Sequence, residues 1–212
     1  KKENVEADMY EQHKLFEKVF AVIIEALRRS FPKNALEVLY EQLLWILPRF
    51  RLPLFRYRTS VTGELVYQLI QHCNSKFPSI RGMAAGALLL MIKQNFEEMK
   101  NFSRMKLQTT IAVSRVFATD TYMTNGIDNL KESLKVIKTN AQNKFAKEKT
   151  KHGSLGNEVK ELTARLEQII EDNLKMEEYS FDPETKVDLY HQISQGYLDS
   201  PDLRLTELEK LA

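Results

Sequence analysis

The sequence is poor in residues that make tight turns or covalent cross-links. Its 212 residues include only 7 glycines, 6 prolines and one cysteine, Cys73. Scarce glycine and proline argue against many β-turns and favour long helices. A single cysteine excludes an internal disulfide and is typical of a reducing, intracellular compartment. We therefore expect a helical protein located in the cytoplasm.

The sequence also lacks a strong excess of positive or negative charge, and it lacks long apolar runs. The 31 basic and 29 acidic residues leave a formal net charge of +2, too small to predict nucleic-acid binding. No apolar run reaches the roughly 20 residues that span a bilayer. The first residues, KKENVEADMYEQHKLFEKVF, are charged and amphipathic, unlike a signal peptide. Because the chain begins with Lys1, we expect it to be a segment of a longer protein.

Apolar residues recur at helical spacing along almost the whole chain. The spacing predicts helices over about 8–31, 35–47, 60–74, 78–98, 101–118, 126–146 and 155–178, with two more beginning after Asp182 and Ser200. Asn34 is a candidate N-cap for the second helix. β-Branched residues make a strand conceivable over 101–118, but the length of that segment favours a helix.

Helices without a sheet can bury their apolar stripes only against one another. The predicted helices recur in pairs about every 40 residues, the spacing of armadillo and HEAT arrays. The expected fold is therefore all-α, either an armadillo/HEAT-like antiparallel helical array or an irregular α-α superhelix. The polar linker KEKTKHGSLG separates an armadillo-like repeat region, residues 1–150, from further helices in residues 151–212.

One predicted helix, PSIRGMAAGALLLMIKQNFEE, is unusual. Its first half carries mostly small side chains, and its middle is apolar on every side. An inner helix with neighbours on both sides needs such a surface. Small residues such as Gly82 and Gly86 let a neighbouring helix approach closer than the usual distance of about 8–10 Å. Each glycine costs roughly 1 kcal/mol relative to alanine within a helix, so we expect close packing there to compensate. The apolar run is too short for Gly82 and Gly86 to indicate a membrane-helix dimer.

No group of residues predicts catalysis. The histidines His13, His72, His152 and His191 lie in different segments, and none has a metal-ligand partner at helical spacing. His72 beside Cys73 is a weak candidate for a metal pair, because adjacent residues point to different faces of a helix. No glycine-rich phosphate loop occurs. We therefore expect no catalytic residue, cofactor or metal in this chain.

The connector RFRLPLFRYR is the most distinctive surface candidate. Its arginines can contact anionic lipid or a partner while its aromatic residues insert. In the alternative, Leu54 and Phe55 fill the helical core and the arginines stay in water. The candidate contact residues are Arg49, Arg51, Phe55, Arg56, Tyr57 and Arg58.

Two stretches of the chain resemble the DOCK (dedicator of cytokinesis) family of guanine nucleotide exchange factors. IRGMAAGALLLMIKQNFEEMKNFSRMKLQTTIAVSRV is similar to a helical segment of that family at Ile80, Arg81, Met91, Gln94, Asn95, Phe96, Glu97, Asn101, Phe102, Arg104, Lys106 and Gln108. KMEEYSFDPETKVDLYHQISQGYLDSPDLRLTELEKLA resembles the beginning of its exchange domain at Lys175, Met176, Asp182, Pro183, Glu184, Asp188, Leu189, Gly196, Tyr197, Ser200, Pro201, Asp202, Leu203, Arg204, Leu205, Thr206, Leu208 and Ala212. A tryptophan of the family pattern is Glu207 here.

The resemblance, nearest to the zizimin-like branch, implies a function. Members of the family exchange GDP for GTP on Rho-type GTPases such as Rac, through an exchange domain (Dock homology region two) of three lobes. The first lobe is a helical array that supports and often dimerises the domain, and a valine in the last lobe displaces the nucleotide's magnesium. No residue of this chain matches that valine. The resemblance therefore implies a helical scaffold without exchange activity of its own, whose GTPase partner is bound elsewhere in the parent protein.

Two other functions remain open at this point. The chain is also compatible with a stand-alone adaptor that binds a peptide or a helix in a groove between repeats. Alternatively, it is an anionic-lipid-binding module that contacts the membrane through Arg49, Arg51, Arg56 and Arg58.

Overall fold

The computed structural model confirms an all-α fold. It describes residues 2–57, 59–118, 127–145, 154–179, 181–198 and 200–209, and no strand occurs among them. The helices are α1 (Lys2–Arg28), α2 (Lys33–Ile46), the π-helix η1 (Pro53–Tyr57), α3 (Thr59–Cys73), α4 (Pro78–Met99), α5 (Ser103–Ala118), α6 (Asp128–Phe145), α8 (Leu155–Glu178), α9 (Pro183–Gly196) and α10 (Pro201–Glu209). Within this part of the chain, no helix combines the length and the apolar character needed to cross a bilayer.

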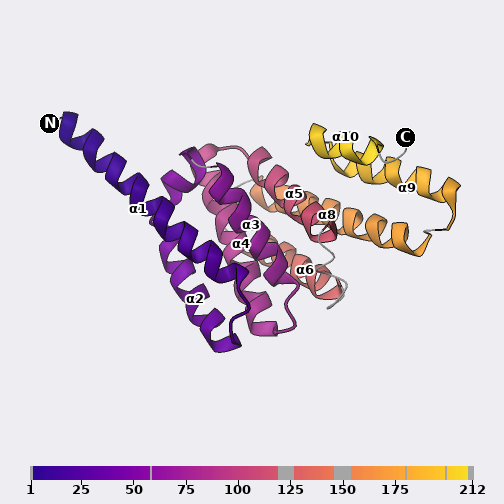
Figure 1. Ribbon diagram of the computed structural model, residues 1–212, viewed down its shortest axis with the longest axis horizontal. Coiled ribbons are helices and arrows are strands. Elements are labelled where there is room, and N and C mark those ends of the chain that lie inside the picture. The colour runs from indigo at the N-terminus through magenta and orange to yellow at the C-terminus, as the bar shows by residue number, and fades with distance from the viewer. Residues whose placement is uncertain are drawn as a thin grey trace.

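The helices stack in two layers (Figure 1). In one layer α1 contacts α3, and α3 contacts α5; in the other α2 contacts α4, and α4 contacts α6. The layers meet where α3 packs on α4, and α8 then packs against both α5 and α6. Helix α9 packs on α8 and α10 on α9, so the N-terminal end of α1 and the α9–α10 pair lie at opposite ends of the molecule. Each amphipathic helix thus buries its apolar stripe against neighbouring helices, as the sequence predicted.

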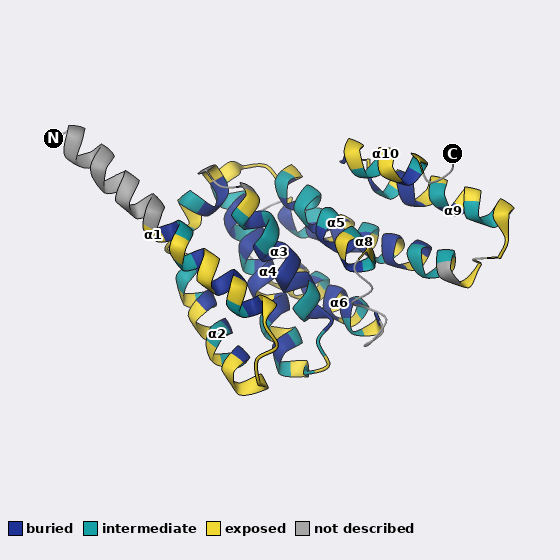
Figure 2. Cartoon of the chain, in the orientation of Figure 1, coloured by how far each residue is buried: buried dark blue, intermediate teal, exposed yellow. Residues whose placement is uncertain are grey.

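A single hydrophobic core runs through the stack. It extends from Phe16 in α1 to Tyr197 just beyond α9, and buried residues line the inner sides of the helices in Figure 2. The largest side chains in it that are almost wholly buried include Tyr40, Phe55 and Tyr197. Because the same core passes through α5, α6 and α8, the described helices on both sides of residue 150 form one packed unit.

The start of α9 has a side-chain cap, whereas the start of α2 lacks the cap that the sequence predicts. Helix α9 begins directly after Asp182, as predicted, and Asp182 caps it, since its Oδ1 accepts hydrogen bonds from the N–H groups of Glu184 (3.2 Å) and Thr185 (3.5 Å). The prediction that Asn34 caps α2 is wrong. The helix begins two residues earlier than predicted, at Lys33, with Pro32 in the N-cap position and no side-chain cap. Residues 31–35 are exposed, so solvent can satisfy the first N–H groups of α2 without a side-chain cap.

Helix α6 takes its cap from another part of the fold. The Oδ1 atom of Asn74, in the turn between α3 and α4, accepts a hydrogen bond from the N–H of Leu130 at 3.1 Å. Nearby, the hydroxyl of Ser133 donates to the carbonyl of Cys73 at 2.7 Å. These buried bonds attach the first turn of α6 to the end of α3.

Helix α4 is the inner helix that its sequence predicts, but its glycines do not make the close contacts. Ala84, Ala85 and Ala87 are buried. Gly82 and Gly86 lie on the exposed side, and a Cβ atom added to either would meet nothing within 4 Å. Open cavities of about 190 and 540 Å³ lie beside these glycines, between α4 and α6. The expected close approach at Gly82 and Gly86 is therefore wrong, because their stripe points away from the face that the alanines pack.

A close contact at a glycine occurs instead at the end of α9. A Cβ atom on Gly196 would lie 2.7 Å from Cγ1 of Ile169 in α8, and Ile169 is itself buried. Gly196 thus allows α9 to pack closely on α8, which brings the following Tyr197 into the core.

These contacts predict opposite effects of replacing glycine with alanine. We expect Gly82→Ala and Gly86→Ala each to raise the free energy of unfolding by about 0.5–1 kcal/mol, because the helix gains a better former at no steric cost. Gly196→Ala should lower it by about 1–3 kcal/mol through overpacking against Ile169. The free energy of unfolding of all three variants can be measured by urea titration, with circular dichroism as the signal. Destabilisation by Gly82→Ala would mean that its side of α4 is packed after all.

Candidate functional site

The basic connector between α2 and α3 is fixed by buried residues of its own and by hydrogen bonds from α3 and α5. It contains the π-helix η1, in which Leu54 and Phe55 are fully buried. The hydroxyl of Thr62 in α3 donates a hydrogen bond to the carbonyl of Leu54 at 2.6 Å, and the guanidinium of Arg104 in α5 donates to the carbonyl of Phe55. Of the two interpretations of this connector, the structure agrees with the one in which Leu54 and Phe55 fill the core.

Two of the connector's arginines share one acidic partner. Nε of Arg51 lies 2.9 Å from Glu98 of α4, and a terminal nitrogen of Arg56 lies 3.8 Å from the other carboxylate oxygen. The Glu98 side chain is only 9% exposed, whereas both arginine side chains are about half exposed. One carboxylate cannot neutralise two guanidinium groups, so positive charge remains at this surface.

Arg49 makes a different contact. Its guanidinium carbon lies 3.2 Å from the ring centroid of Trp45, and Nη1 donates to the Trp45 carbonyl at 2.6 Å. Trp45 is 58% exposed, and Leu52, seven residues further along the chain, is 45% exposed. Stacking on an aromatic ring orients an arginine without removing it from water.

We call the exposed part of this region the connector patch, and it comprises Trp45, Arg49, Arg51, Leu52 and Arg56. Of the predicted contact residues, Phe55 lies beneath the patch in the core, Tyr57 ends η1, and Arg58 lies outside the described residues. Sequence reasoning missed Trp45 and Leu52. The signal for Trp45 was its position off the buried stripe formed by Leu36, Tyr40 and Leu43.

His72 and Cys73, the weak candidate for a metal pair, have separate structural environments. The hydroxyl of Tyr40 lies 2.7 Å from Nδ1 of His72, and a hydrogen bond to the Leu27 backbone also involves this imidazole. Cys73 is completely buried, which raises the pKa of its thiol to about 12. A protonated thiol is a poor metal ligand. Among the described residues, no three His, Cys, Asp or Glu side chains gather as a metal site would require.

The His72 contacts join three helices. Leu27 lies near the end of α1, Tyr40 lies in α2, and His72 is in the last turn of α3. Burial lowers the pKa of His72 and is the larger effect, while the hydrogen bond to Leu27 acts in the opposite direction. The neutral imidazole is therefore the form that the folded protein favours.

This burial predicts that stability falls in mild acid. Because the folded pKa of His72 lies below the unfolded one, the contribution of His72 is fully present above the unfolded value of about 6.5 and is lost as the pH falls from there through the folded pKa. We expect a lower urea midpoint at about pH 5.5 than at about pH 7.5. His72→Asn keeps an acceptor for Tyr40 without a titrating ring, and should flatten this pH dependence. An equally steep dependence in that variant would assign the effect to other groups.

Known proteins resemble this chain over most of its length. Dedicator of cytokinesis protein 7 from Homo sapiens is 36% identical over 159 residues, 75% of this chain, and protein 11 from Danio rerio is 32% identical over 200 residues, 93% of this chain. Dedicator of cytokinesis protein 8 from Homo sapiens is 28% identical over 194 residues, 92% of this chain. The chain spans only 7% of the first of these proteins and 9% of the other two. No protein-family profile and no solved structure matches it.

Proposed function

This chain is homologous over most of its length to dedicator of cytokinesis proteins, and on that premise we propose that it is a helical scaffold segment of a DOCK-type exchange factor for Rho-family GTPases. In this proposal residues 1–150 form an armadillo-like support, and residues 151–212 lead into the first lobe of the exchange domain (Dock homology region two) of a zizimin-like member. The GTPase is bound by other parts of the parent protein, so the segment alone does not catalyse exchange. The parent is cytoplasmic and is recruited to membranes.

The observation that carries the proposal is the continuous core across the boundary near residue 150. Lys106 of α5 forms an ion pair with Glu158 of α8 at 3.0 Å. The Tyr197 hydroxyl hydrogen-bonds to the side chains of Ser114 and Asn173, and burial raises its pKa to about 12. Contacts of this kind support a rigid junction, through which the array can fix the position of the exchange domain.

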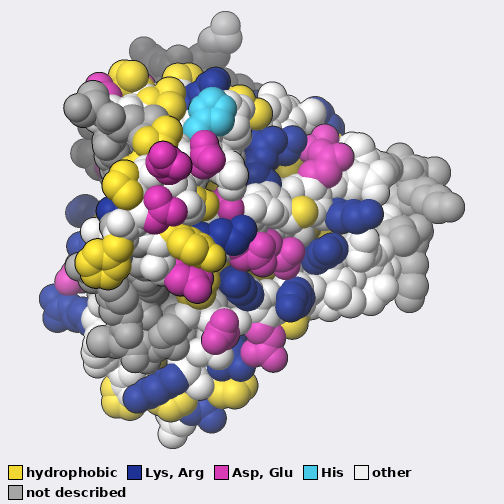
Figure 3. All heavy atoms as spheres, turned by 90° about the vertical axis from the view of Figure 1, so that its right-hand side faces the viewer, with side chains coloured by type: hydrophobic (Ala, Val, Ile, Leu, Met, Phe, Trp, Pro, Cys, Tyr) yellow, Lys and Arg dark blue, Asp and Glu magenta, His cyan; other side chains and the backbone are white. Residues whose placement is uncertain are grey.

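The end of the molecule formed by α9 and α10 offers a surface that the exchange domain could contact. Figure 3 shows it with hydrophobic side chains among acidic and basic ones. Large exposed side chains of α9, α10 and the turn before α9 include Phe181, which is 98% exposed, Val187 and Leu205. We propose that the rest of the exchange domain, or a second copy of it in a homodimer, contacts this end.

The junction can be tested through the single tryptophan. Leu166 is buried in α8, far along the chain from Trp45 in α2. If all the helices form one cooperative unit, Leu166→Ala should lower stability by about 2–4 kcal/mol. The tryptophan fluorescence and circular dichroism transitions should then shift together. Leu205→Ala, at a 57% exposed position, is the control and should change little.

Separate transitions, with the tryptophan signal unaffected by Leu166→Ala, would refute a rigid junction.

In the same preparations, Rac loaded with labelled GDP should release nucleotide no faster with this chain than in buffer. Accelerated release would refute the assignment of the exchange activity to other parts of the parent.

The connector patch favours a second, compatible role in contacting anionic lipid. An exposed tryptophan and leucine beside three arginines are the residue types found at membrane interfaces. We propose that the patch helps to hold the parent protein at an anionic membrane. A basic residue near such a surface contributes about 1 kcal/mol.

Vesicle sedimentation tests this role. Phosphatidylcholine vesicles containing phosphatidylinositol bisphosphate should sediment the chain, and pure phosphatidylcholine vesicles should not. Replacing Arg49, Arg51, Arg56 and Arg58 with serine should weaken sedimentation by about tenfold or more. The control replaces Lys135, Lys138, Lys160 and Lys186 with serine, which removes equal charge elsewhere. The same loss in both variants, or no loss in either, would rule out a specific role for the patch.

A further inference from the structure

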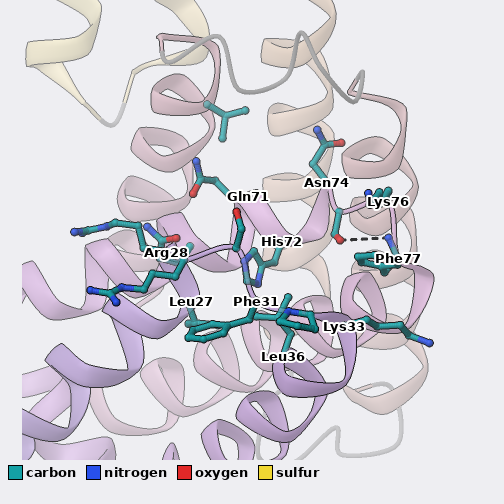
Figure 4. Close-up of a pocket in the computed structure, with 16 residues that line it drawn as sticks. Leu27, Arg28, Phe31, Lys33, Leu36, Gln71, His72, Asn74, Lys76 and Phe77 are labelled. Atoms are coloured by element: carbon teal, nitrogen blue, oxygen red, sulfur yellow. Dashed lines mark hydrogen bonds between the residues drawn. The ribbon is translucent and has the colours of Figure 1, made fainter.

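A cleft of about 570 Å³ lies between two turns of the helical array. One wall is the turn between α1 and α2, around Phe31, and the other is the turn between α3 and α4, around Lys76. The side chains of Gln71 and His72 from α3 lie between them (Figure 4). This volume is within the range of sites that bind small ligands or short peptides.

Among the residues that the structure describes, those lining the cleft include basic side chains and no acidic ones. Arg28, Arg29, Lys33 and Lys76 contribute to its walls. In Figure 4 Arg28 lies on one side, and Lys33 and Lys76 lie on the other. A ligand in the cleft would therefore have cations on both sides, which favours a ligand with negative charge.

The carboxylates near these cations lie outside the cleft and hold them weakly. Arg28 contacts Glu25 at 3.3 Å and Glu64 at 3.1 Å, and Arg29 also contacts Glu25 at 3.0 Å. Lys33 lies 3.5 Å from Glu37 one helical turn away. Surface pairs of this kind contribute about 0–1 kcal/mol each. A multivalent anion can compete for the same cations.

Lys76 has the least acidic surroundings of the four. Its ammonium group lies 5.2 Å from the ring centroid of Phe77, and no described carboxylate forms an ion pair with it. Two helices also begin at the cleft, α2 after Pro32 and α4 after Phe77. Neither has a side-chain cap or an acidic residue in its first turn. Their N-terminal partial charges add to the positive potential of the cleft.

The remaining lining residues favour a peptide over a bare anion. Phe31 is 42% exposed at the rim, and Phe77 lies opposite, so aromatic surface is available to an apolar side chain. Gln71 also lines the cleft; its amide nitrogen donates to the Tyr67 hydroxyl at 2.9 Å, and its amide oxygen can accept a hydrogen bond from an extended backbone. A flat membrane would meet the rim of this concave site but not its walls.

We propose that this cleft binds a short acidic peptide segment of a partner protein, which also carries an apolar side chain. Carboxylates of the peptide contact Lys33 and Lys76, and its apolar side chain packs between Phe31 and Phe77. This inference rests on the cleft alone and does not depend on the family to which the chain is homologous.

Fluorescence anisotropy tests the proposal on the 212-residue chain. The probe is a fluorescein-labelled heptapeptide, Glu-Asp-Glu-Phe-Glu-Asp-Glu, and its neutral counterpart is Gln-Asn-Gln-Phe-Gln-Asn-Gln. We expect saturable binding of the acidic probe only, with about tenfold weaker binding in the double variant Lys33→Gln/Lys76→Gln. The matched control, Lys135→Gln/Lys160→Gln, removes two exposed charges elsewhere and should bind like the unmodified chain.

Several results would overturn the proposal. One is the absence of saturable binding of the acidic probe up to about 1 mM, the weak limit of specific association. Others are equal binding of the neutral counterpart, or equal weakening in both lysine variants, which would indicate unspecific charge attraction. Anionic vesicles that bind the chain through Lys33 and Lys76, without binding of the peptide, would identify the site as a membrane contact. Circular dichroism confirms that the variants fold.

Discussion

The requirement to bury α4 organises the rest of the molecule. Its middle is apolar around most of its circumference, so a single partner helix cannot cover it. Helices α2, α3 and α6 surround it, together with η1, and only the stripe with Gly82 and Gly86 stays open. The two layers of the array follow from this, because a helix covered on several sides needs neighbours in its own layer and in the next.

The connector shows how one segment can serve the core and the surface together. Its apolar residues Leu54 and Phe55, both in η1, are buried, and hydrogen bonds from Thr62 and Arg104 fix the backbone around them. Anchoring the backbone in this way holds the arginines at the surface in a defined arrangement. The candidate lipid contact therefore depends on the core packing of the same few residues.

Periodicity and local signals predicted most of the helices well. The helix over 155–178 has the same ends in the structure, and α9 begins directly after Asp182, as predicted. The predictions failed where a contact partner decided the outcome. Asn34 does not cap α2, and Gly196 makes a close helix contact where Gly82 and Gly86 make none. The candidate site was likewise predicted in part, since the arginines stood out in sequence but their partners Trp45 and Glu98 did not.

The sequence by itself determined which segments are helical and which face of each helix is apolar, because both depend on residues a few positions apart. It also carried the resemblance to the DOCK family, which similarity over most of the chain supports. Only the tertiary structure decided which helices are neighbours, and therefore which charges pair and where clefts remain open. Glu98 and Arg51 are far apart in the chain, and so are the turns that hold Phe31 and Lys76. Their meeting depends on how whole helices stack, and local spacing does not contain that information.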